Sequence, residues 1–306
     1  MKKYSSLLLC AVLCLLTACG AKEGAPSAAS VPSPDISVEV EKPPAQPPEI
    51  ILYTVGMNSS GETVYAEDGT VLLTSSFRYP TLSVHRGNGM TITEGETEKE
   101  AAALAAAEVF NGYFSSWGSN DRAEGDIMAA DKELAMEDYA WRKSEGIAWN
   151  GSYAMELDCT VYQTRRMISV TGLSYSYTGG AHPNSVNMAW NFDLESGEFF
   201  GPELLGGTEL QTAVAEELKR QSAERAKEFG AAPEEVYWAD YEAILDDWQS
   251  SAVSFGPQGM TVAYSPYELA AYAFGAQVYE ISYEFLRPYL SLQGLELLGL
   301  AEEPGA

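Results

Sequence analysis

Apolar and polar residues alternate most clearly in the middle of the chain. Every odd position from Tyr153 to Val161 is apolar, and from Val186 to Leu194 the apolar residues stand at the even positions. A repeat of two is typical of a strand that turns one face to the core and the other to water. Residues 167–177 read as a strand that returns the chain after a turn at residues 163–166, so the pattern predicts three consecutive antiparallel strands.

Strand and helix patterns also flank this region. Strand patterns cover residues 50–55, 62–66, 70–75, 81–85, 252–255, 260–264 and 277–282, and Pro80 interrupts the series. Helical patterns cover an Ala-rich run after Thr97, residues 126–143, a run after Thr208 and a run opened by Pro233. Because strands and helices are grouped rather than strictly alternating, we expect an α+β fold, with antiparallel sheets and helices packed on one face.

The helical run that Pro233 opens carries one apolar stripe, formed by Tyr237, Tyr241, Ile244, Leu245 and Trp248. A stripe of this kind usually faces a core rather than a ligand. Cys159 lies on the apolar face of its predicted strand, which suits a buried, inert thiol. We therefore expect both the stripe and the thiol to be buried.

The first residues follow the pattern of a secretory signal peptide. Lys2 and Lys3 precede an apolar run from Leu7 to Leu16, which is shorter than the about 20 residues that a membrane-spanning helix needs. The sequence Leu-Thr-Ala-Cys at residues 16–19 is similar to the lipobox of bacterial lipoproteins. This resemblance implies that residues 1–18 are removed, that Cys19 is acylated, and that the protein is anchored by lipid on the extracytoplasmic face of the membrane.

Residues 19–49 read as the lipidated cysteine followed by a disordered, Pro-rich tether. Seven of the fifteen prolines of the chain lie between residues 20 and 49, with Ala, Ser and Glu around them. A segment of this composition is extended and has little apolar surface to bury. At about 3.1 Å per residue it reaches roughly 90 Å, which suits a spacer through a cell wall.

The charge balance of the chain is strongly acidic. Lys and Arg number 18 against 44 Asp and Glu, and the formal net charge is −26. Nucleic acids and anionic lipids are poor partners for such a surface. A cationic partner would be attracted by this field, and plain solubility explains the same charge.

The sequence contains no motif for metal or cofactor chemistry. Its two histidines, His85 and His182, have no zinc-binding spacing, and Cys-x-x-Cys pairs, Gly-x-Ser-x-Gly elbows, P-loops and Gly-x-Gly-x-x-Gly motifs do not occur. We therefore expect no cofactor, no metal site and no catalytic residue.

The run from Tyr175 to Pro183, Tyr-Ser-Tyr-Thr-Gly-Gly-Ala-His-Pro, is the best candidate for ligand contact. Two glycines allow backbone angles closed to other residues, and tyrosines offer flat amphipathic surface. One interpretation is a ligand-binding loop that uses Tyr175, Tyr177, Gly179, Gly180, His182 and Pro183. The other is a tight bend in which His182 hydrogen-bonds the backbone and locks the turn.

The same loop carries a family resemblance. Residues 177–183, followed by segments 191–197, 255–262, 265–270 and 278–283, resemble the extracellular domain of the RsiV family of lysozyme-sensing anti-sigma factors. The preceding part, with a strand-turn-strand around Asp68-Gly69 and a Tyr79-Pro80 step, looks like the companion domain found in RsiV and in the peptidoglycan deacetylase PdaC.

The resemblance implies two α+β domains, a PdaC-like domain at residues 50–171 and an RsiV-like domain at residues 172–297. We expect neither the sigma-binding and transmembrane segments of RsiV nor the catalytic metal domain of the deacetylase. We therefore expect this chain to correspond to the extracellular sensing or binding part of such proteins, attached to a lipid.

Three functions fit the sequence. The resemblance and the acidic charge favour a non-catalytic lipoprotein that binds or senses lysozyme or a similar cationic cell-wall hydrolase. The 18 tyrosines and 6 tryptophans, with the deacetylase resemblance, favour a module that binds peptidoglycan or other cell-wall glycan. An uncharacterised hydrolase centred on His182 and nearby tyrosines is the third.

Overall fold

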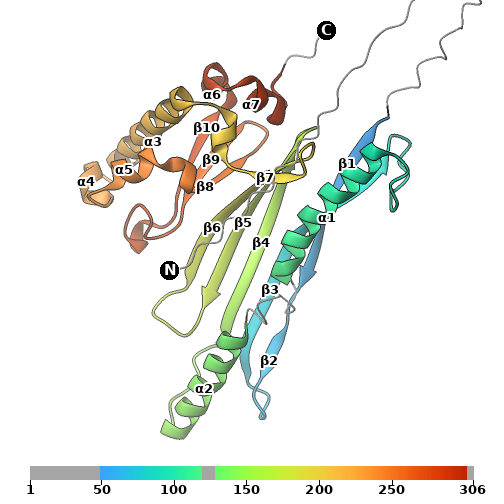
Figure 1. Cartoon of the computed structure of the whole chain (residues 1–306). Coiled ribbons are helices and arrows are strands. Elements are labelled where there is room, and N and C mark those ends of the chain that lie inside the picture. The colour runs from blue at the N-terminus through green and yellow to red at the C-terminus, as the bar shows by residue number, and fades with distance from the viewer. Residues whose placement is uncertain (1–48, 119–127, 302–306) are drawn as a thin grey trace, which may run out of the picture. The chain divides into compact units, whose positions relative to one another are not determined.

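The computed structural model describes residues 49–118 and 128–301. The expected signal peptide, Cys19 and the whole tether except Glu49 lie outside these residues. Within the described ranges, no helix is both long and apolar enough to cross a membrane. The strands form a large sheet and a small sheet that helices cover (Figure 1), so the α+β prediction is confirmed.

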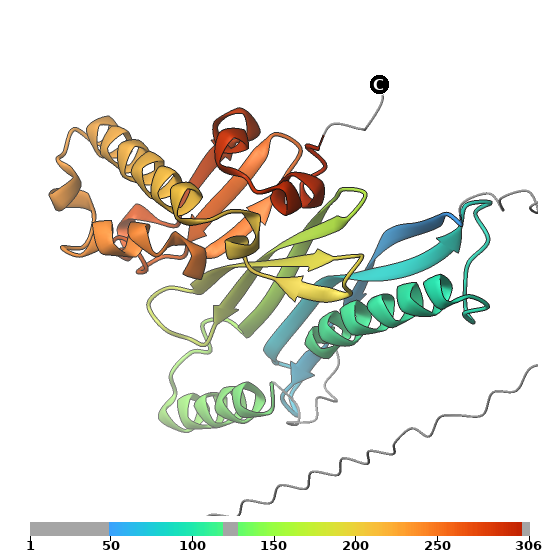
Figure 2. The same ribbon diagram turned by 45° about the horizontal axis from the view of Figure 1, so that its top comes forward.

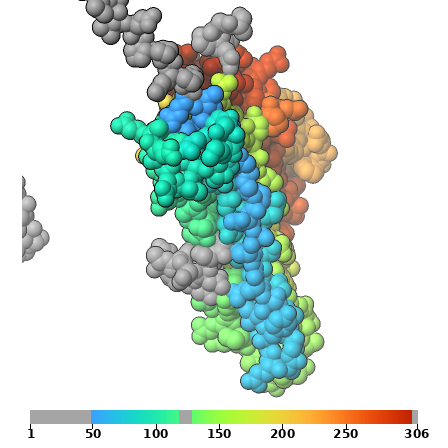
Figure 3. Space-filling model, turned by 90° about the vertical axis from the view of Figure 1, so that its right-hand side faces the viewer, coloured from blue at the N-terminus to red at the C-terminus, as the bar shows by residue number. Residues whose placement is uncertain are grey.

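The large sheet has the strand order β1-β3-β4-β5-β6-β7, and β2 also pairs with β3. Its neighbouring strands are antiparallel except β3 and β4, which run parallel. Figure 3 shows β1 and β2 following one another along one side of the molecule. The strands are β1 (Ile51–Ser60), β2 (Thr63–Tyr65), β3 (Val71–Arg86), β4 (Tyr153–Gln163), β5 (Met167–Tyr177), β6 (Asn184–Asp193) and β7 (Glu198–Phe200).

The three strands predicted in the middle of the chain are confirmed as β4, β5 and β6, which pair antiparallel in one register. The expected domain boundary between residues 171 and 172 falls inside β5, and the large sheet continues across it to β7.

The predicted interruption at Pro80 is wrong, because β3 runs through it and pairs Pro80 with Met57 of β1. Proline has no backbone N–H to donate, and the pairing of β3 with β4 already ends at Arg78.

Two helices, α1 (Glu98–Gly118) and α2 (Ala129–Glu145), cover one face of the large sheet (Figures 1 and 2). Phe110 and Phe114 of α1 are fully buried and pack against Phe192 of β6 and Phe199 of β7. Cys159 is buried in the same core, as predicted, and burial raises the pKa of its thiol to about 11.

The first turn of α1 holds the start of β1 and the end of β3. Thr97 Oγ1 donates to the carboxylate of Glu49, and Lys99 Nζ donates to the backbone carbonyl of the same residue. The buried Glu100 accepts from Arg86 Nε at 2.6 Å, and this ion pair lowers the pKa of the Glu100 carboxyl. Glu49, the first described residue, is therefore held in place by Thr97 and Lys99.

The small sheet has the strand order β10-β9-β8, and α3 packs on it around the buried Tyr279. Side chains of α3 also close the outer edge of β10, because Arg225 donates to the carbonyl of Val278 and Gln221 donates to the carbonyl of Glu280. The elements of this part are α3 (Thr208–Glu228), β8 (Ala252–Phe255), β9 (Gly259–Tyr264), β10 (Gln277–Ser282), α6 (Tyr283–Leu286) and α7 (Leu292–Leu297).

The run opened by Pro233 is not one helix but α4 (Pro233–Val236), α5 (Tyr241–Asp246) and a 3-10 turn at residues 248–250. The helix breaks because Tyr237 forms a β-bridge with Ala270 and the Trp238 N–H donates to the carbonyl of Leu269. The prediction that its stripe belongs to the core is confirmed. Four of its members are buried and one packs against them: Tyr237, Tyr241, Leu245 and Trp248, with Ile244.

Two buried polar side chains attach the small sheet to the large one. Phe255 N–H donates to Ser169 Oγ at 2.8 Å, Ser169 Oγ donates to Asn191 Oδ1 at 2.8 Å, and Asn191 Nδ2 donates to the carbonyl of Val253 at 2.9 Å. Val253 and Phe255 belong to β8, the edge strand of the small sheet. The two side chains therefore take the place of a further strand and satisfy backbone groups that would otherwise be buried without partners.

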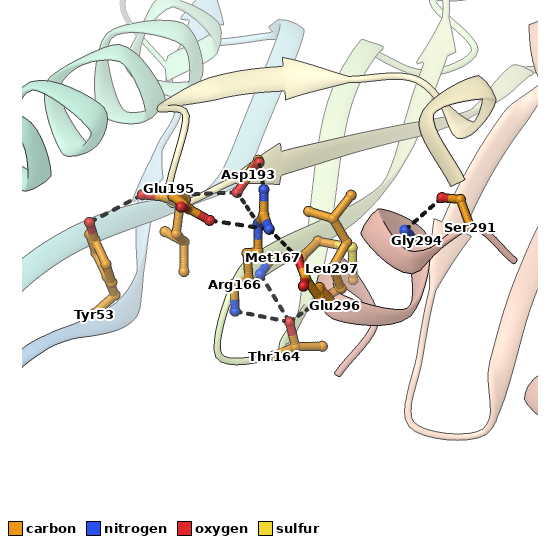
Figure 4. Close-up of polar contacts among 11 residues, drawn as sticks. Tyr53, Thr164, Arg166, Met167, Asp193, Glu195, Ser291, Gly294, Glu296 and Leu297 are labelled. Carbon is orange, nitrogen blue, oxygen red and sulfur yellow. Dashed lines mark hydrogen bonds and ion pairs between the residues drawn. The ribbon is translucent and has the colours of Figure 1, made fainter. Parts of the chain in front are cut away.

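A second polar contact joins the turns at one end of the large sheet to α7 (Figure 4). Arg166 donates to both carboxylate oxygens of the buried Asp193 at 3.1 Å and reaches Glu296 of α7 at 2.9 Å. Thr164 Oγ1 donates to the carbonyl of Leu297 at 2.8 Å. The turn between β4 and β5 thereby holds the C-terminal helix in place.

Residues 178–183 connect β5 to β6 and include one position that requires glycine. Gly179 has a φ of +80°, and a Cβ there would lie 3.2 Å from Cε1 of Tyr153. At Gly180 the nearest atom to such a Cβ is 3.9 Å away, and the residue is outside the left-handed region. The sharp bend of this connection therefore depends on Gly179.

Replacing Asn191 by leucine is expected to lower the free energy of unfolding by about 2–3 kcal/mol, because the Val253 carbonyl and Ser169 lose a buried partner. Urea unfolding followed by tryptophan fluorescence measures the change. Asn184→Leu, at an exposed position of the same strand, is the control and is expected to stay within about 0.5 kcal/mol of the parent. Equal stability of Asn191→Leu and the parent would show that the sheets do not depend on this contact.

Gly179→Ala is expected to lower the free energy of unfolding by about 1–2 kcal/mol, because alanine is strained in the left-handed region. Gly180→Ala, one residue later, is expected to change it by less than about 0.5 kcal/mol. Thermal unfolding of the two variants side by side tests the pair. Equal losses of stability in the two variants would refute the conclusion that the bend depends on Gly179.

Candidate binding site

The predicted contact residues lie together at one end of the β5–β6 hairpin. Tyr175 and Tyr177 close β5 and are half-buried. They share the strand face of Ser169, the face that turns away from α1, because alternate residues of a strand point the same way. Of the predicted residues in the connection that follows, Pro183 is half-buried, and Gly179, Gly180 and His182 are exposed. Their role in ligand binding stays a prediction.

His182 is held between two tyrosines from a distant part of the sequence. Its ring stacks on Tyr272, with ring centres 3.8 Å apart and an interplanar angle of 20°, and its Nε2 lies 3.2 Å from Tyr267 Oη. Its Nδ1 lies 2.9 Å from the carbonyl of Pro183. A carbonyl only accepts, so Nδ1 donates to it, and Nε2 is left to form a hydrogen bond with the Tyr267 hydroxyl. The histidine thus does bond the backbone, and it also joins the hairpin to the C-terminal part.

Tyr267 is the one non-glycine residue with positive φ, 75°, in the described ranges. The left-handed region costs an ordinary residue about 1–2 kcal/mol, and such strain persists where the surroundings hold it. Here the Tyr267 N–H donates to the carbonyl of Ala270, and its own carbonyl accepts from Trp238 Nε1 at 2.9 Å. Two residues earlier, Ser265 Oγ accepts from the N–H of Asn187 on β6 at 3.0 Å. Contacts on both sides therefore hold the strained residue beside the hairpin.

Four residues form a group that we call the aromatic cluster: His182, Trp238, Tyr267 and Tyr272. The rings of Tyr267 and Tyr272 lie 5.5 Å apart. Tyr267 is 53% exposed and Trp238 is 38% exposed, although both are fixed by hydrogen bonds. Large aromatic side chains that are held rigid and left in contact with water are typical of contact surfaces.

The sequence around the aromatic cluster is acidic. No Lys, Arg or His occurs between Lys227 and Arg287, whereas ten Asp or Glu residues do. This stretch of the chain therefore carries a net negative charge. The exposed acidic residues next to Trp238 and Tyr267 in the sequence are Glu234, Glu235, Asp240 and Glu268.

The glycine half of the loop faces a different surface, which we call the α2 groove. It has a volume of about 440 Å³ and is lined by Leu134, Glu137, Asp138, Trp141 and Arg142 of α2, Tyr153 of β4 and residues 178–180. Trp141 is 54% exposed. Arg142 Nε donates to both carboxylate oxygens of Asp138 at 3.0 Å. One loop therefore contributes to two surfaces, with Gly179 and Gly180 at the groove and His182 in the aromatic cluster.

Sequence reasoning missed Trp141, Trp238, Tyr267 and Tyr272. Tyr267 lies in one of the segments that carry the RsiV resemblance, but no spacing rule brings it to His182, which is 85 residues away. Among the described residues, no group of three or more His, Cys, Asp or Glu could hold a metal ion. The arrangement offers aromatic faces, hydroxyl groups and carboxylates for contact with a ligand.

Two family models match separate parts of the chain. Residues 96–185 match the model described as deacetylase PdaC, and residues 198–284 match the model described as a protein of unknown function, DUF3298. The first segment contains the α2 groove and His182, and the second contains the other three members of the aromatic cluster. The PdaC part of the resemblance is thus supported, and the RsiV part stays a prediction. No curated protein matches the chain.

Solved structures of two DUF3298 family proteins are similar to this chain. One, from Bacteroides fragilis NCTC 9343, is 16% identical with a TM-score of 0.54, and the match covers 79% of this chain and 95% of that one. The other, from Pseudomonas aeruginosa PAO1, is 14% identical with a TM-score of 0.47 and coverages of 79% and 96%. The first likeness shows a shared fold. The chain therefore carries a segment similar to the PdaC model, followed by a segment similar to the DUF3298 model.

Proposed function

We propose that this chain is a non-catalytic binding module, anchored by lipid at Cys19 outside the cell, and that its ligand is lysozyme or a similar cationic cell-wall hydrolase. The lipobox-like sequence at residues 16–19 supports the anchor. The Pro-rich composition of residues 20–49 supports a spacer that reaches roughly 90 Å at most. The proposed partner would thus meet the domain at a distance from the membrane.

The aromatic cluster within its acidic surroundings is the observation that carries this proposal. A cationic protein presents Lys and Arg side chains, which bind to the faces of Trp and Tyr rings and to carboxylates. Trp238 and Tyr267 supply the exposed rings, and their acidic neighbours in the sequence supply the carboxylates. The absence of basic residues from 228 to 286 removes local repulsion toward such a partner. The sequence resemblance to RsiV points to the same class of partner.

Calorimetric titration of the full chain with hen egg-white lysozyme tests the proposal. Binding is expected in 0.1 M salt and is expected to weaken strongly in 1 M salt, because the screening length falls from about 10 Å to about 3 Å. Trp238→Ala and Tyr267→Ala are each expected to weaken binding about tenfold, which corresponds to about 1.4 kcal/mol.

Leu292→Ala is the matched control, because Leu292 is 82% exposed and lies outside the aromatic cluster; its affinity is expected to equal that of the parent. Cytochrome c, another basic protein, tests whether charge alone suffices. Absence of lysozyme binding, affinity that does not change with salt, or equal affinity for cytochrome c would each refute the proposal.

A further inference from the structure

We propose that the α2 groove binds a neutral saccharide chain, at a site separate from the aromatic cluster. The proposal rests on the shape and chemistry of the groove and does not depend on a cationic partner. Figures 1 and 2 both place α2 beside the end of the β5–β6 hairpin, so the groove lies between a helix and a glycine-containing loop.

Two exposed apolar side chains of α2 form the floor of the proposed site. Leu134 is 46% exposed and Trp141 is 54% exposed, and both line the groove. They are seven residues apart on one helix, so they share a face and are separated by about 10 Å along its axis. This distance suits two linked sugar rings, whose C–H faces pack on flat aromatic surface.

The polar groups of the groove suit a ligand that is uncharged and rich in hydroxyl groups. Asp138 and Arg142 neutralise one another through two hydrogen bonds of 3.0 Å, and Tyr153 Oη lies 3.4 Å from Asp138 Oδ2. Glu137 is a further, exposed carboxylate of the lining, so the groove combines donors and acceptors with a small net negative charge, smaller than that of the stretch around Trp238 and Tyr267. Hydroxyl groups both donate and accept, so they can use both kinds of partner.

The glycines of the loop open the groove to a bulky ligand. Gly179 and Gly180 are exposed and carry no side chain, so a ligand can approach the backbone of residues 178–180 directly. The loop backbone passes close to Tyr153 of β4, because a Cβ at Gly179 would lie 3.2 Å from the Tyr153 ring, and the positive φ of Gly179 favours glycine at this position. The wall of the groove is thereby preformed, which lowers the cost of binding.

Calorimetry and tryptophan fluorescence of the full chain, titrated with tetra-N-acetylchitotetraose and with cellotetraose, test the proposal. At least one of the two sugars is expected to bind. Preference for the first would indicate an N-acetylated glycan and preference for the second an unsubstituted glucan. Trp141→Ala is expected to weaken binding about tenfold or more, because the stacking surface is lost.

Alanine is a strong helix former, so replacing the exposed Trp141 is expected to leave α2 folded. Leu134→Ala provides a second variant in the groove. Tyr65→Ala is the matched control, because Tyr65 is 60% exposed and does not line the groove; its affinity is expected to equal that of the parent. Failure of both sugars to bind at millimolar concentration, or full affinity in Trp141→Ala, would overturn the proposal. A response to tetralysine without a response to either sugar would assign the groove to cationic peptides and would also overturn it. Because sugar binding is the readout, the result is independent of lysozyme binding.

Discussion

The attachment of β8 to the face of the large sheet is the constraint on which the other features depend. Ser169 and Asn191 provide this attachment through three buried hydrogen bonds. Once β8 is placed, β9 and the segment after it follow, and Ser265 meets the backbone of Asn187 on β6. That contact brings Tyr267 to the β5–β6 hairpin. A buried polar network costs free energy when any of its hydrogen bonds is missing. The two sheets therefore dock in one well-defined geometry, and this geometry also fixes the position of the aromatic cluster.

Local patterns were sufficient to predict the central strands and insufficient to predict the aromatic cluster and the α2 groove. The alternation that predicts β4, β5 and β6 is a property of neighbouring residues, and the burial of Leu245 and Trp248 follows from their spacing. The break of the helix at Tyr237 could not be predicted, because its cause is a bridge to Ala270, a residue far along the chain. The position of Tyr267 beside His182 has the same origin, since tertiary contacts decide it.

Three of the arginines stand where separate elements of the fold meet. Arg166 meets three carboxylates where two turns and α7 come together, Arg86 pairs with Glu100 between β3 and α1, and Arg225 closes the edge of β10. Ion pairs at exposed sites contribute little to stability, whereas partly buried arginines with fixed geometry orient what they join. The net negative charge itself follows from the composition, with 44 Asp and Glu against 18 Lys and Arg.

The hydrogen bonds that Thr97 and Lys99 make to Glu49 affect how the domain would respond to a mechanical pull. Thr97 and Lys99 fix Glu49 directly before β1, which pairs with β3 over ten residues. Figure 1 shows the start of β1 and of α1 at one end of the large sheet, and α2 with the tip of the β5–β6 hairpin at the other end. A pull through the preceding segment would enter along the β1–β3 ladder and would shear many hydrogen bonds together instead of opening them one by one. The β5–β6 hairpin is a separate pair of strands, so its connection at residues 178–183 is not among the hydrogen bonds that this pull would shear.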